Sequence, residues 1–302
     1  MPTLVPTQRR PLRDADGFGG LVPVAAVAER GETLVAVLAV EHHAEGFALP
    51  VLVLTAAPGL VQWSPRVGLT ARDDRGGSYA ASVAGSQSAL GTLVCTAWLE
   101  PALPPEARRL ELVVDALARV SPARGGGTGV ARPLAGGPWT LAIELVPERT
   151  AAELPPPPGR APEAPEPGST PARSFAGFRD IVPVGQARLA GGAAVCLWAL
   201  ERYAERAVLT VAVLGSGDDE IPPLAGGQGR VEAWDDRGGA YAVTPLGGVA
   251  GSGWSETVLE LVPAIDPRAR ALGVRLADLP GGRETTLDGP FSFGVALPPP
   301  PA

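Results

Sequence analysis

The sequence predicts an all-β protein made of two similar antiparallel β-sandwich domains joined by a proline-rich linker. The heptad Asp-Asp-Arg-Gly-Gly-Ser-Tyr at residues 73–79 returns as Asp-Asp-Arg-Gly-Gly-Ala-Tyr at residues 235–241. Short runs that alternate apolar and polar residues surround both copies, which is typical of strands with one buried face. Turn signals recur about every ten residues and convincing long amphipathic helices are absent, as in a two-sheet sandwich.

The repeated heptad predicts a hairpin loop in each half. Aspartate side chains accept hydrogen bonds from the backbone two residues on, and glycine takes positive φ at no steric cost. Because alternating runs enter and leave each copy, the loop joins two antiparallel strands. The predicted loop residues are Asp73, Asp74, Gly76, Gly77 and Tyr79, and then Asp235, Asp236, Gly238, Gly239 and Tyr241.

The paired aspartates have a second interpretation as a calcium site, because hard cations bind carboxylate oxygens. Calcium takes about six or more oxygen ligands, and no Asp-x-Asp-x-Asp spacing supplies them here. We therefore favour turn chemistry and expect no cofactor. Tyr79 and Tyr241 each stand in a strand that leaves its hairpin, followed by small or apolar residues at alternate positions. Both rings are expected to be buried.

Composition limits the classes of function. The chain has 302 residues and a formal net charge of −7, which argues against nucleic-acid binding through a basic face. There is no lysine to form a Schiff base. The two cysteines, Cys95 and Cys196, have apolar neighbours and are expected to be buried free thiols. With no signal-like apolar region at the start and no membrane span, a cytoplasmic setting is expected.

The order of these segments predicts the domain organisation. We expect a flexible arm at residues 1–15, a first sandwich at 16–148, a proline-rich linker at 149–174, a second sandwich at 175–299 and a tail at 300–302. The two sandwiches are in register at an offset near 160. A polyproline II linker of this length could hold the domains up to roughly 60–70 Å apart.

Two kinds of strand can be placed within each predicted domain. Val22-Pro23-Val24 and Val182-Pro183-Val184 are expected on edge strands, because proline cannot donate to a sheet ladder. Residues 33–41 and 194–201 are apolar on both faces and end in glutamate, which predicts central strands that are covered on each side.

The candidate binding residues are Trp98, Trp234 and Arg72. With Ala97 and Leu99 pointing inward, alternation places Trp98 on the outer face of its strand. Trp234 points outward beside the second hairpin, at the position that Arg72 takes in the first half. An outward tryptophan is either a ligand platform or partner contact, or a ring covered by a connector or by the other domain.

No catalytic or metal-binding residues are expected. The adjacent His42 and His43 would point to opposite faces of a strand, which is poor geometry for one metal ion, so we expect a solvated strand end. There is no Gly-x-Ser-x-Gly elbow, and the glycine runs lack the Lys-Ser/Thr of a phosphate loop.

The order of motifs resembles tandem bacterial immunoglobulin-like β-sandwich domains. The residues that carry the resemblance are Asp74, Gly76, Tyr79, Pro104, Pro105, Ala107 and Leu110, and then Asp236, Gly238, Tyr241, Pro267, Ala269 and Leu272. The resemblance implies two homologous immunoglobulin-like sandwiches that serve as binding or spacing units. It implies no catalytic residues. Such modules usually stand outside the cell, whereas this sequence shows no signal or lipobox.

Three classes of function remain open. The favoured one is a non-catalytic interaction or scaffold protein whose sandwich surfaces bind a protein partner, with a homo-oligomer also open. The second is a carbohydrate- or small-ligand-binding sandwich that uses outward tryptophans. The third is a hydrolase that works through carboxylates alone, since pairing in space is invisible in a sequence.

Overall fold

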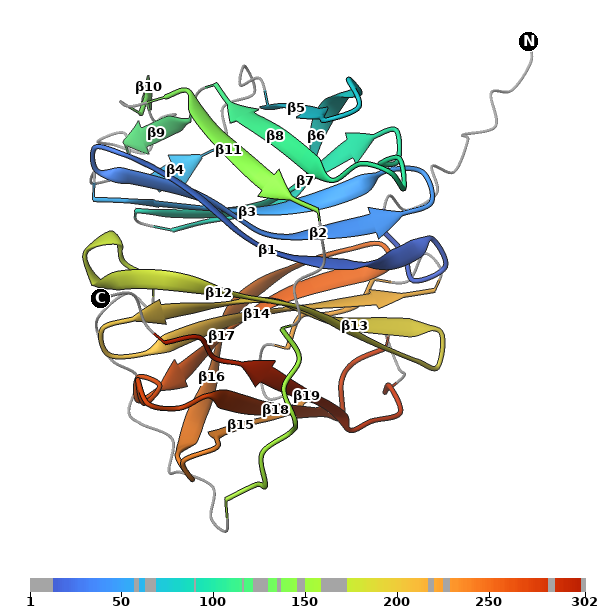
Figure 1. The fold of residues 1–302 in the computed structure, drawn as a ribbon, viewed down its shortest axis with the longest axis vertical. Helices are drawn as coiled ribbons and strands as arrows, with labels where there is room; N and C mark the ends of the chain where they lie inside the picture. The colour runs from blue at the N-terminus through green and yellow to red at the C-terminus, as the bar shows by residue number, and fades with distance from the viewer. Residues whose placement is uncertain are drawn as a thin grey trace.

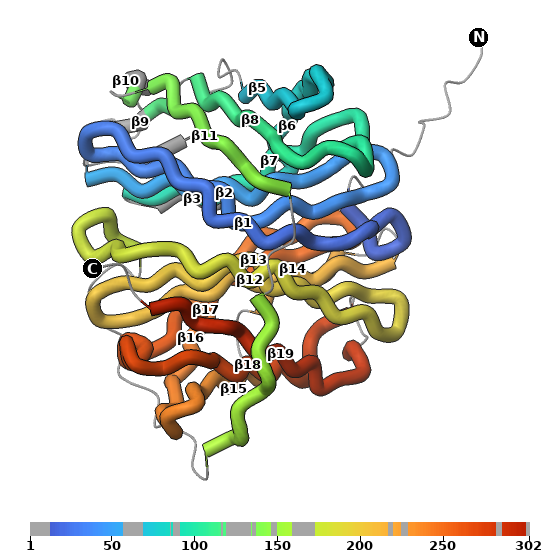
Figure 2. Tube along the Cα trace, in the orientation of Figure 1, coloured from blue at the N-terminus to red at the C-terminus, as the bar shows by residue number. Residues whose placement is uncertain are grey.

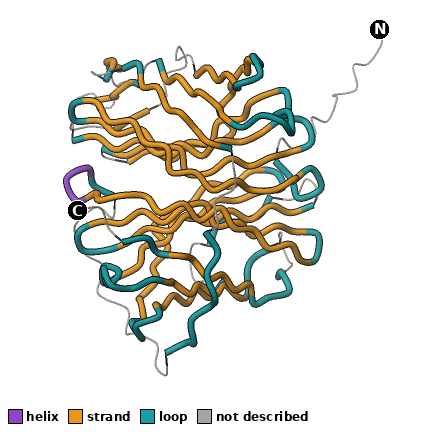
Figure 3. Tube along the Cα trace, viewed as in Figure 1, coloured by secondary structure: helices purple, strands orange, loops and turns teal. Residues whose placement is uncertain are grey.

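The computed structural model describes residues 13–56, 60–62, 69–89, 91–115, 117–121, 130–134, 137–145, 150–158, 173–216, 220–224, 229–281 and 286–299. Across these ranges the chain is all-β apart from one 3₁₀ turn, η1 (Phe175–Gly177) (Figure 3). No helix in the described ranges is long and apolar enough to cross a membrane.

Strands β1 to β11 lie in the first half of the chain. They are β1 (Phe18–Arg30), β2 (Thr33–His43), β3 (Phe47–Thr55), β4 (Leu60–Gln62), β5 (Leu69–Asp73), β6 (Ser78–Ala89), β7 (Thr92–Glu100), β8 (Arg109–Val114), β9 (Ala118–Ser121), β10 (Val130–Pro133) and β11 (Trp139–Glu144). Eight of them form one antiparallel sheet in the order β1-β2-β3-β7-β6-β5-β8-β11. The other three form a small sheet, β10-β9-β4, which the sequence did not predict.

The second half builds the same sheet again. Its strands are β12 (Phe178–Ala190), β13 (Ala193–Tyr203), β14 (Ala207–Gly215), β15 (Arg230–Asp235), β16 (Ala240–Gly251), β17 (Trp254–Val262), β18 (Ala271–Ala277) and β19 (Phe291–Ala296). Their order, β12-β13-β14-β17-β16-β15-β18-β19, matches the first sheet strand for strand. The sequence repeat is therefore also a repeat of topology.

Pairing register repeats as well. Phe18 lies opposite His43 in the first sheet, and Phe178 lies opposite Tyr203 in the second. The edge strands β1 and β12 each carry a register shift just after Pro23 or Pro183, the two prolines expected on edges. Both edge-strand predictions are confirmed, because β1 and β12 stand first in their sheets.

Each eight-stranded sheet curls into a barrel-like form, which differs from the predicted pair of separate sheets. The reason lies in the hairpin strands, because β5 pairs with both β6 and β8, and β15 pairs with both β16 and β18. A hydrogen-bonded ladder therefore runs on from one layer to the next. At the open side of the first sheet, β1 lies against β11.

At the open side of the second sheet, residues of the predicted linker fill the seam between β12 and β19. The N–H of Ala152 donates to the carbonyl of Gly294 at 2.9 Å. The side-chain amide of Gln186 in β12 donates to Gly294 at 2.9 Å and to Thr150 at 3.3 Å. The start of the linker is thus part of the second barrel-like unit (Figure 1).

The two sheets pack directly against each other (Figures 1 and 2). In β2, Val35 and Val37 face the core of the first sheet, while Leu34, Ala36 and Leu38 face the second sheet. This confirms the prediction that strands with two apolar faces are covered on each side. The sheets are therefore not held apart, because their apolar outer faces are buried against each other. Of the predicted linker, residues 150–158 lie on the second sheet, and residues 149 and 159–172 lie outside the described residues.

The interface between the sheets is self-complementary. Strand β1 contacts its counterpart β12, and β6 contacts its counterpart β16. Likewise β1 contacts β13 while β12 contacts β2, so each contact has a mirror partner in the other half. This is the arrangement of a symmetric homodimer, here within one chain.

Candidate functional site

The first aspartate of each heptad closes its hairpin loop. Oδ1 of Asp73 accepts hydrogen bonds from the N–H groups of Arg75 at 2.9 Å and Gly77 at 2.7 Å, and Oδ2 accepts one from the Tyr79 hydroxyl. Gly76, at φ +90°, takes a conformation that side chains disfavour. Burial would raise the pKa of Asp73, but these hydrogen bonds lower it below its usual value.

The second hairpin repeats this geometry. Oδ1 of Asp235 accepts from the N–H groups of Arg237 at 2.9 Å and Gly239 at 2.8 Å, and its Oδ2 accepts from Tyr241. Gly238 has φ +85°. Tyr79 and Tyr241 are each 4% exposed, which confirms that both rings are buried.

The second aspartate of each heptad ties the hairpin to the proline-containing connector. Asp74 accepts from the N–H of Arg108 at 3.1 Å, and Asp236 accepts from the N–H of Arg270 at 3.0 Å. That backbone hydrogen bond lowers the pKa of Asp236. The carboxylates are thus engaged by N–H and O–H donors, and within the described ranges no cluster of His, Cys, Asp and Glu could hold a metal ion.

Trp98 points away from the core of the first sheet, as alternation predicts, but it is not a ligand platform. Its ring is 3% exposed, and the ring of His43 meets it edge-on at 5.2 Å. Phe18 in turn packs edge-on against His43, and the indole N–H donates to Glu100 at 2.9 Å. The start of β1 and the end of β2 therefore cover the tryptophan.

Trp234 also points outward and is covered, with only 1% of the residue exposed. Its indole N–H donates to the carbonyl of Pro155 at 2.8 Å. The ring lies over Gly273, where an added Cβ would stand 2.5 Å from the indole. Arg275 packs on the ring with its guanidinium carbon 5.6 Å from the ring centre.

The three candidate binding residues do not form one site. Arg72 is exposed in β5, opposite Ser78 and Glu111. Trp98 lies in β7 of the same sheet, whereas Trp234 lies in β15, at the far end of the second sheet (Figure 1).

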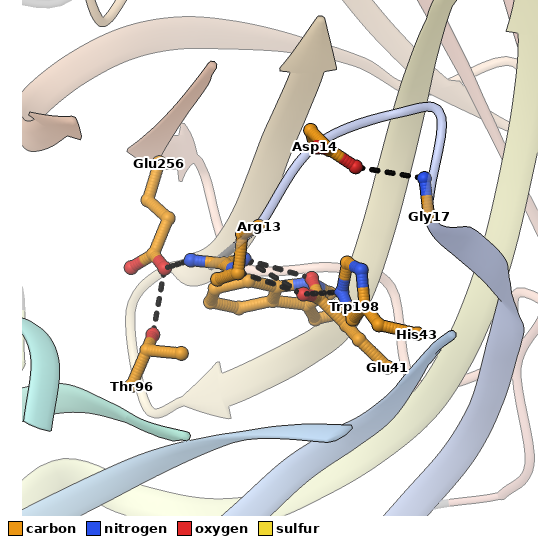
Figure 4. Close-up of polar contacts among 8 residues, drawn as sticks. All are labelled: Arg13, Asp14, Gly17, Glu41, His43, Thr96, Trp198 and Glu256. Atoms are coloured by element: carbon orange, nitrogen blue, oxygen red, sulfur yellow. Dashed lines mark hydrogen bonds and ion pairs between the residues drawn. The ribbon is translucent and has the colours of Figure 1, made fainter. Parts of the chain in front are cut away.

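The structure gathers a polar cluster that the sequence did not reveal, between the two sheets (Figure 4). Arg13, assigned from sequence to the flexible arm, is fully buried. Its Nε and Nη2 donate to Glu41 of β2 at 3.0 and 2.9 Å, and its Nη1 donates to Glu256 of β17. One guanidinium thus links the first sheet to the second.

Neutral donors and aromatic rings complete the cluster. Thr96 donates to Glu256 at 2.6 Å, and the indole N–H of Trp198 donates to Glu41 at 2.7 Å (Figure 4). The guanidinium of Arg13 lies over the ring of Trp254 at 4.7 Å. A buried cation gains from such ring contacts because water is excluded.

The two carboxylates of the cluster have opposite pKa shifts. Burial raises the pKa of Glu41, but Arg13, His43 and Trp198 together outweigh this and hold it below its usual value. Burial raises the pKa of Glu256, and the opposing effects of Arg13 and Thr96 do not cancel it. Glu256 is therefore the group in this cluster that favours its protonated form.

A related ion pair stands at the equivalent place in the second half. Arg173 donates to Glu201 from Nε at 2.8 Å, and the Tyr203 hydroxyl donates to the same carboxylate at 2.7 Å. A second carboxylate is missing at this place, because Glu256 corresponds to Val94 in the repeat. The sequence does contain a signal for these two ion pairs. An arginine precedes the first strand of each half, and a glutamate ends each run that was predicted as a central strand.

His43 and the two cysteines are buried, whereas His42 is half-buried. His43 is 6% exposed, with Nε2 at 3.5 Å from Glu41, so it is not the solvated strand end expected from sequence. Cys95 and Cys196 are free and buried, as predicted, and burial raises the pKa of both thiols. A thiol held protonated is a poor nucleophile.

An accessible pocket of about 400 Å³ opens beside Trp234. Strands β15 and β16 pair only at Ala233 with Tyr241 and at Trp234 with Ala240, and the pocket lies along this short ladder. Pro157 and Pro158 form part of its wall. The pocket combines aromatic, proline and backbone groups with the charged side chains of Glu232 and Arg275.

Comparison with known proteins adds little. No family model matches the chain, and no curated protein is similar to it in sequence. A solved structure described as the crystal structure of the conserved domain protein from Bacillus anthracis is similar at 10% identity, over 92% of each chain, with a TM-score of 0.29. That score is too low to carry an argument about fold or function.

Proposed function

We propose that this protein is a non-catalytic interaction protein, in which two homologous immunoglobulin-like β-sandwich modules bind a protein partner. One observation carries the proposal. The Arg13–Glu41–Glu256 cluster lies buried between the sheets, whereas the pocket beside Trp234 is lined by rings, prolines and strand backbone, with Glu232 and Arg275 as its charged groups.

Burial argues against an acid–base role for the inner cluster. Catalytic groups must come within hydrogen-bond reach of a substrate. Arg13 and Glu41 are 0% exposed, and their hydrogen bonds are made with each other and with neighbouring protein groups. These contacts therefore suit a structural role, in which the cluster holds the two sheets together.

The fixed arrangement of the sheets favours binding. Because the sheets pack back to back, the hairpins of β5–β6 and β15–β16 stand at opposite ends of the molecule (Figure 1). Two faces held in a fixed geometry lose little entropy when a partner engages both. The packing of β1 on β12 and the hydrogen bonds of Arg13 to both sheets keep that geometry.

A second candidate is the binding of a small ligand in the pocket beside Trp234. Its volume of about 400 Å³ falls within the range of small-molecule sites. A carbohydrate platform is less favoured, because the rings of Trp98 and Trp234 are covered. A carboxylate-dependent hydrolase would need Glu41 and Glu256, which share one buried arginine.

Affinity capture of the full chain from its native cell, followed by mass spectrometry, tests the proposal. We expect a protein partner in stoichiometric amount, retained after washing at moderate salt. A purified chain that turns over a substrate in a broad hydrolase screen, while recovering no such partner, would overturn it.

A further inference from the structure

We propose that the pocket beside Trp234 is a groove for proline-rich segments in the polyproline II conformation. Residues 155–158 of the chain itself occupy one end of this groove as a built-in competitor. This inference rests on the proposed function and names the class of partner, a protein segment with several prolines in succession.

The first support is the contact that the chain already makes. The indole N–H of Trp234 donates to the carbonyl of Pro155 at 2.8 Å, and both residues are buried. Proline offers a carbonyl acceptor and no N–H donor. A tryptophan that presents one donor within an apolar surface therefore matches the polar group of a proline chain.

The second support is conformation. Residues 155–158 are four prolines in succession, and each pyrrolidine ring fixes φ near the polyproline II value. Such a segment loses little conformational entropy on docking. Aromatic-lined grooves in other proteins recognise proline-rich segments for this reason.

The third support is the room that remains. The pocket of about 400 Å³ continues along Pro157 and Pro158, with Trp234, Tyr241 and Arg275 on its other walls. A longer or differently placed proline segment could fill it. At the rim, the guanidinium of Arg275 lies 3.5 Å from the carboxylate of Glu232. A positive and a negative side chain are therefore both available to charged residues that flank the prolines of a bound segment.

Among the described residues, the tryptophan of this groove has no counterpart at the equivalent position of the first half. The residue that corresponds to Trp234 in the first half is Arg72, which is exposed in β5. The first sheet thus lacks the donor and the ring on which the second sheet seats its prolines. This difference supplies an internal control.

A tethered segment competes strongly with a free one, because a short linker gives an effective concentration of about millimolar. We therefore expect the native chain to bind a free proline peptide weakly. Replacing the four prolines at 155–158 by serine should expose the groove. The affinity for the peptide should then rise by about tenfold or more.

The test uses a fluorescently labelled peptide of the sequence Ala-Glu-Leu-Pro-Pro-Pro-Pro-Gly-Arg, titrated into both full-length chains and followed by polarisation. In the serine-substituted chain, Trp234→Phe should weaken binding by about tenfold, since it keeps a ring and removes the donor. Trp98→Phe, which changes another covered tryptophan in the first sheet, should leave binding unchanged.

Three results would overturn the groove assignment. The first is that the peptide does not bind to a serine-substituted chain that keeps its native melting temperature. The second is that a peptide with four alanines in place of the prolines binds equally well, and the third is that the two tryptophan substitutions have equal effects on binding. If the serine chain melts early, the milder variant P155G/P156G, which loosens the segment at its contact with Trp234, takes its place.

A separate readout distinguishes this inference from the proposed function. If the native chain captures a protein partner that an excess of the proline peptide does not displace, the groove assignment is wrong while the interaction function stands. If no partner is captured, the proposed function fails, and the peptide titration still decides whether the groove binds prolines.

Discussion

Arg13 and Glu41, 28 residues apart in the chain, form a two-point ion pair at 3.0 and 2.9 Å inside the interface between the two sheets. Both are fully buried, so neither charge can be solvated if the other is removed. Without the charge of Glu41, Glu256 is the one carboxylate left beside Arg13 in the cluster, and losing one partner of a buried ion pair is strongly destabilising.

Glu41→Gln should therefore destabilise the protein by about 3–5 kcal/mol, measured by urea unfolding at pH 7. The matched control is Glu144→Gln, whose partner Arg109 lies at 3.7 Å in an exposed pair. We expect a change below about 1 kcal/mol there. If both variants changed the free energy of unfolding by similarly small amounts, the buried Arg13 would not depend on Glu41 for its stability.

The stability from this pair has a definite pH dependence. The pKa of Glu41 is lower in the folded protein than its usual value, because Arg13, His43 and Trp198 together outweigh the effect of burial. A depressed carboxyl pKa stabilises the fold above the unfolded-state pKa, and the contribution is lost as pH falls through the folded-state value. In Glu41→Gln, the acid-induced loss of stability should be smaller than in the native chain.

Glu256→Gln should behave in the opposite way. The pKa of Glu256 is raised by burial, so the folded state holds its proton more tightly than the unfolded state does. Stability from this group is fully present below the unfolded-state pKa and falls as pH rises toward the folded-state value. A glutamine oxygen can still accept from Thr96, so the variant should gain stability relative to the native chain as the pH rises above the unfolded-state pKa of Glu256. Equal pH profiles would contradict the assignment.

Local sequence pattern predicted much of the fold, because strand periodicity and turn chemistry are local properties. The Asp73 and Asp235 hairpins, the edge prolines Pro23 and Pro183, and the outward direction of Trp98 all follow from neighbours in the chain. Which side chains cover an outward-facing residue, in contrast, depends on segments that are distant in the chain. The ring over Trp98 comes from His43, and no pattern around residue 98 indicates it.

The polar cluster escaped prediction for the same reason. Arg13 and Glu256 are 243 residues apart, and only the packing of one sheet on the other brings them together. The contacts of residues 150–158 were not predicted, because proline content indicates a stiff segment and carries no information about the surface on which the segment packs. Trp234 and Gly294 supply the contacts that hold residues 150–158 on the second sheet.

The buried tyrosines give a test of the hairpin cores. Tyr79→Ala should cost about 3–5 kcal/mol, because a large ring packed against Phe47 at 5.0 Å is lost. Tyr79→Phe should cost only about 1 kcal/mol, since it removes just the hydrogen bond to Asp73. For Tyr241 we likewise expect the alanine substitution to cost several times more stability than the phenylalanine substitution. Changes below about 1 kcal/mol in both alanine variants would show that the rings contribute little.

The last prediction concerns the two halves expressed apart. Separation exposes the apolar outer face of each sheet, which in the second half includes Ile181, Ala199 and Val208. Since β12 packs on its own counterpart β1 in the intact chain, an isolated second half can bury that face on another copy of itself. We expect a fragment of residues 150–299 to be folded by circular dichroism and dimeric by light scattering.

A second fragment isolates the role of the linker. Residues 173–299 keep Arg173 as the partner of Glu201 but lack the segment whose Thr150 and Ala152 hydrogen bond to β19, so the seam between β12 and β19 opens and Trp234 loses its acceptor. This fragment should melt at a lower temperature than residues 150–299. Equal melting temperatures would show that the segment lies on the second sheet without stabilising it. A folded, monomeric 150–299 fragment would mean that the outer apolar face needs no cover, contrary to the packing of strands with two apolar faces.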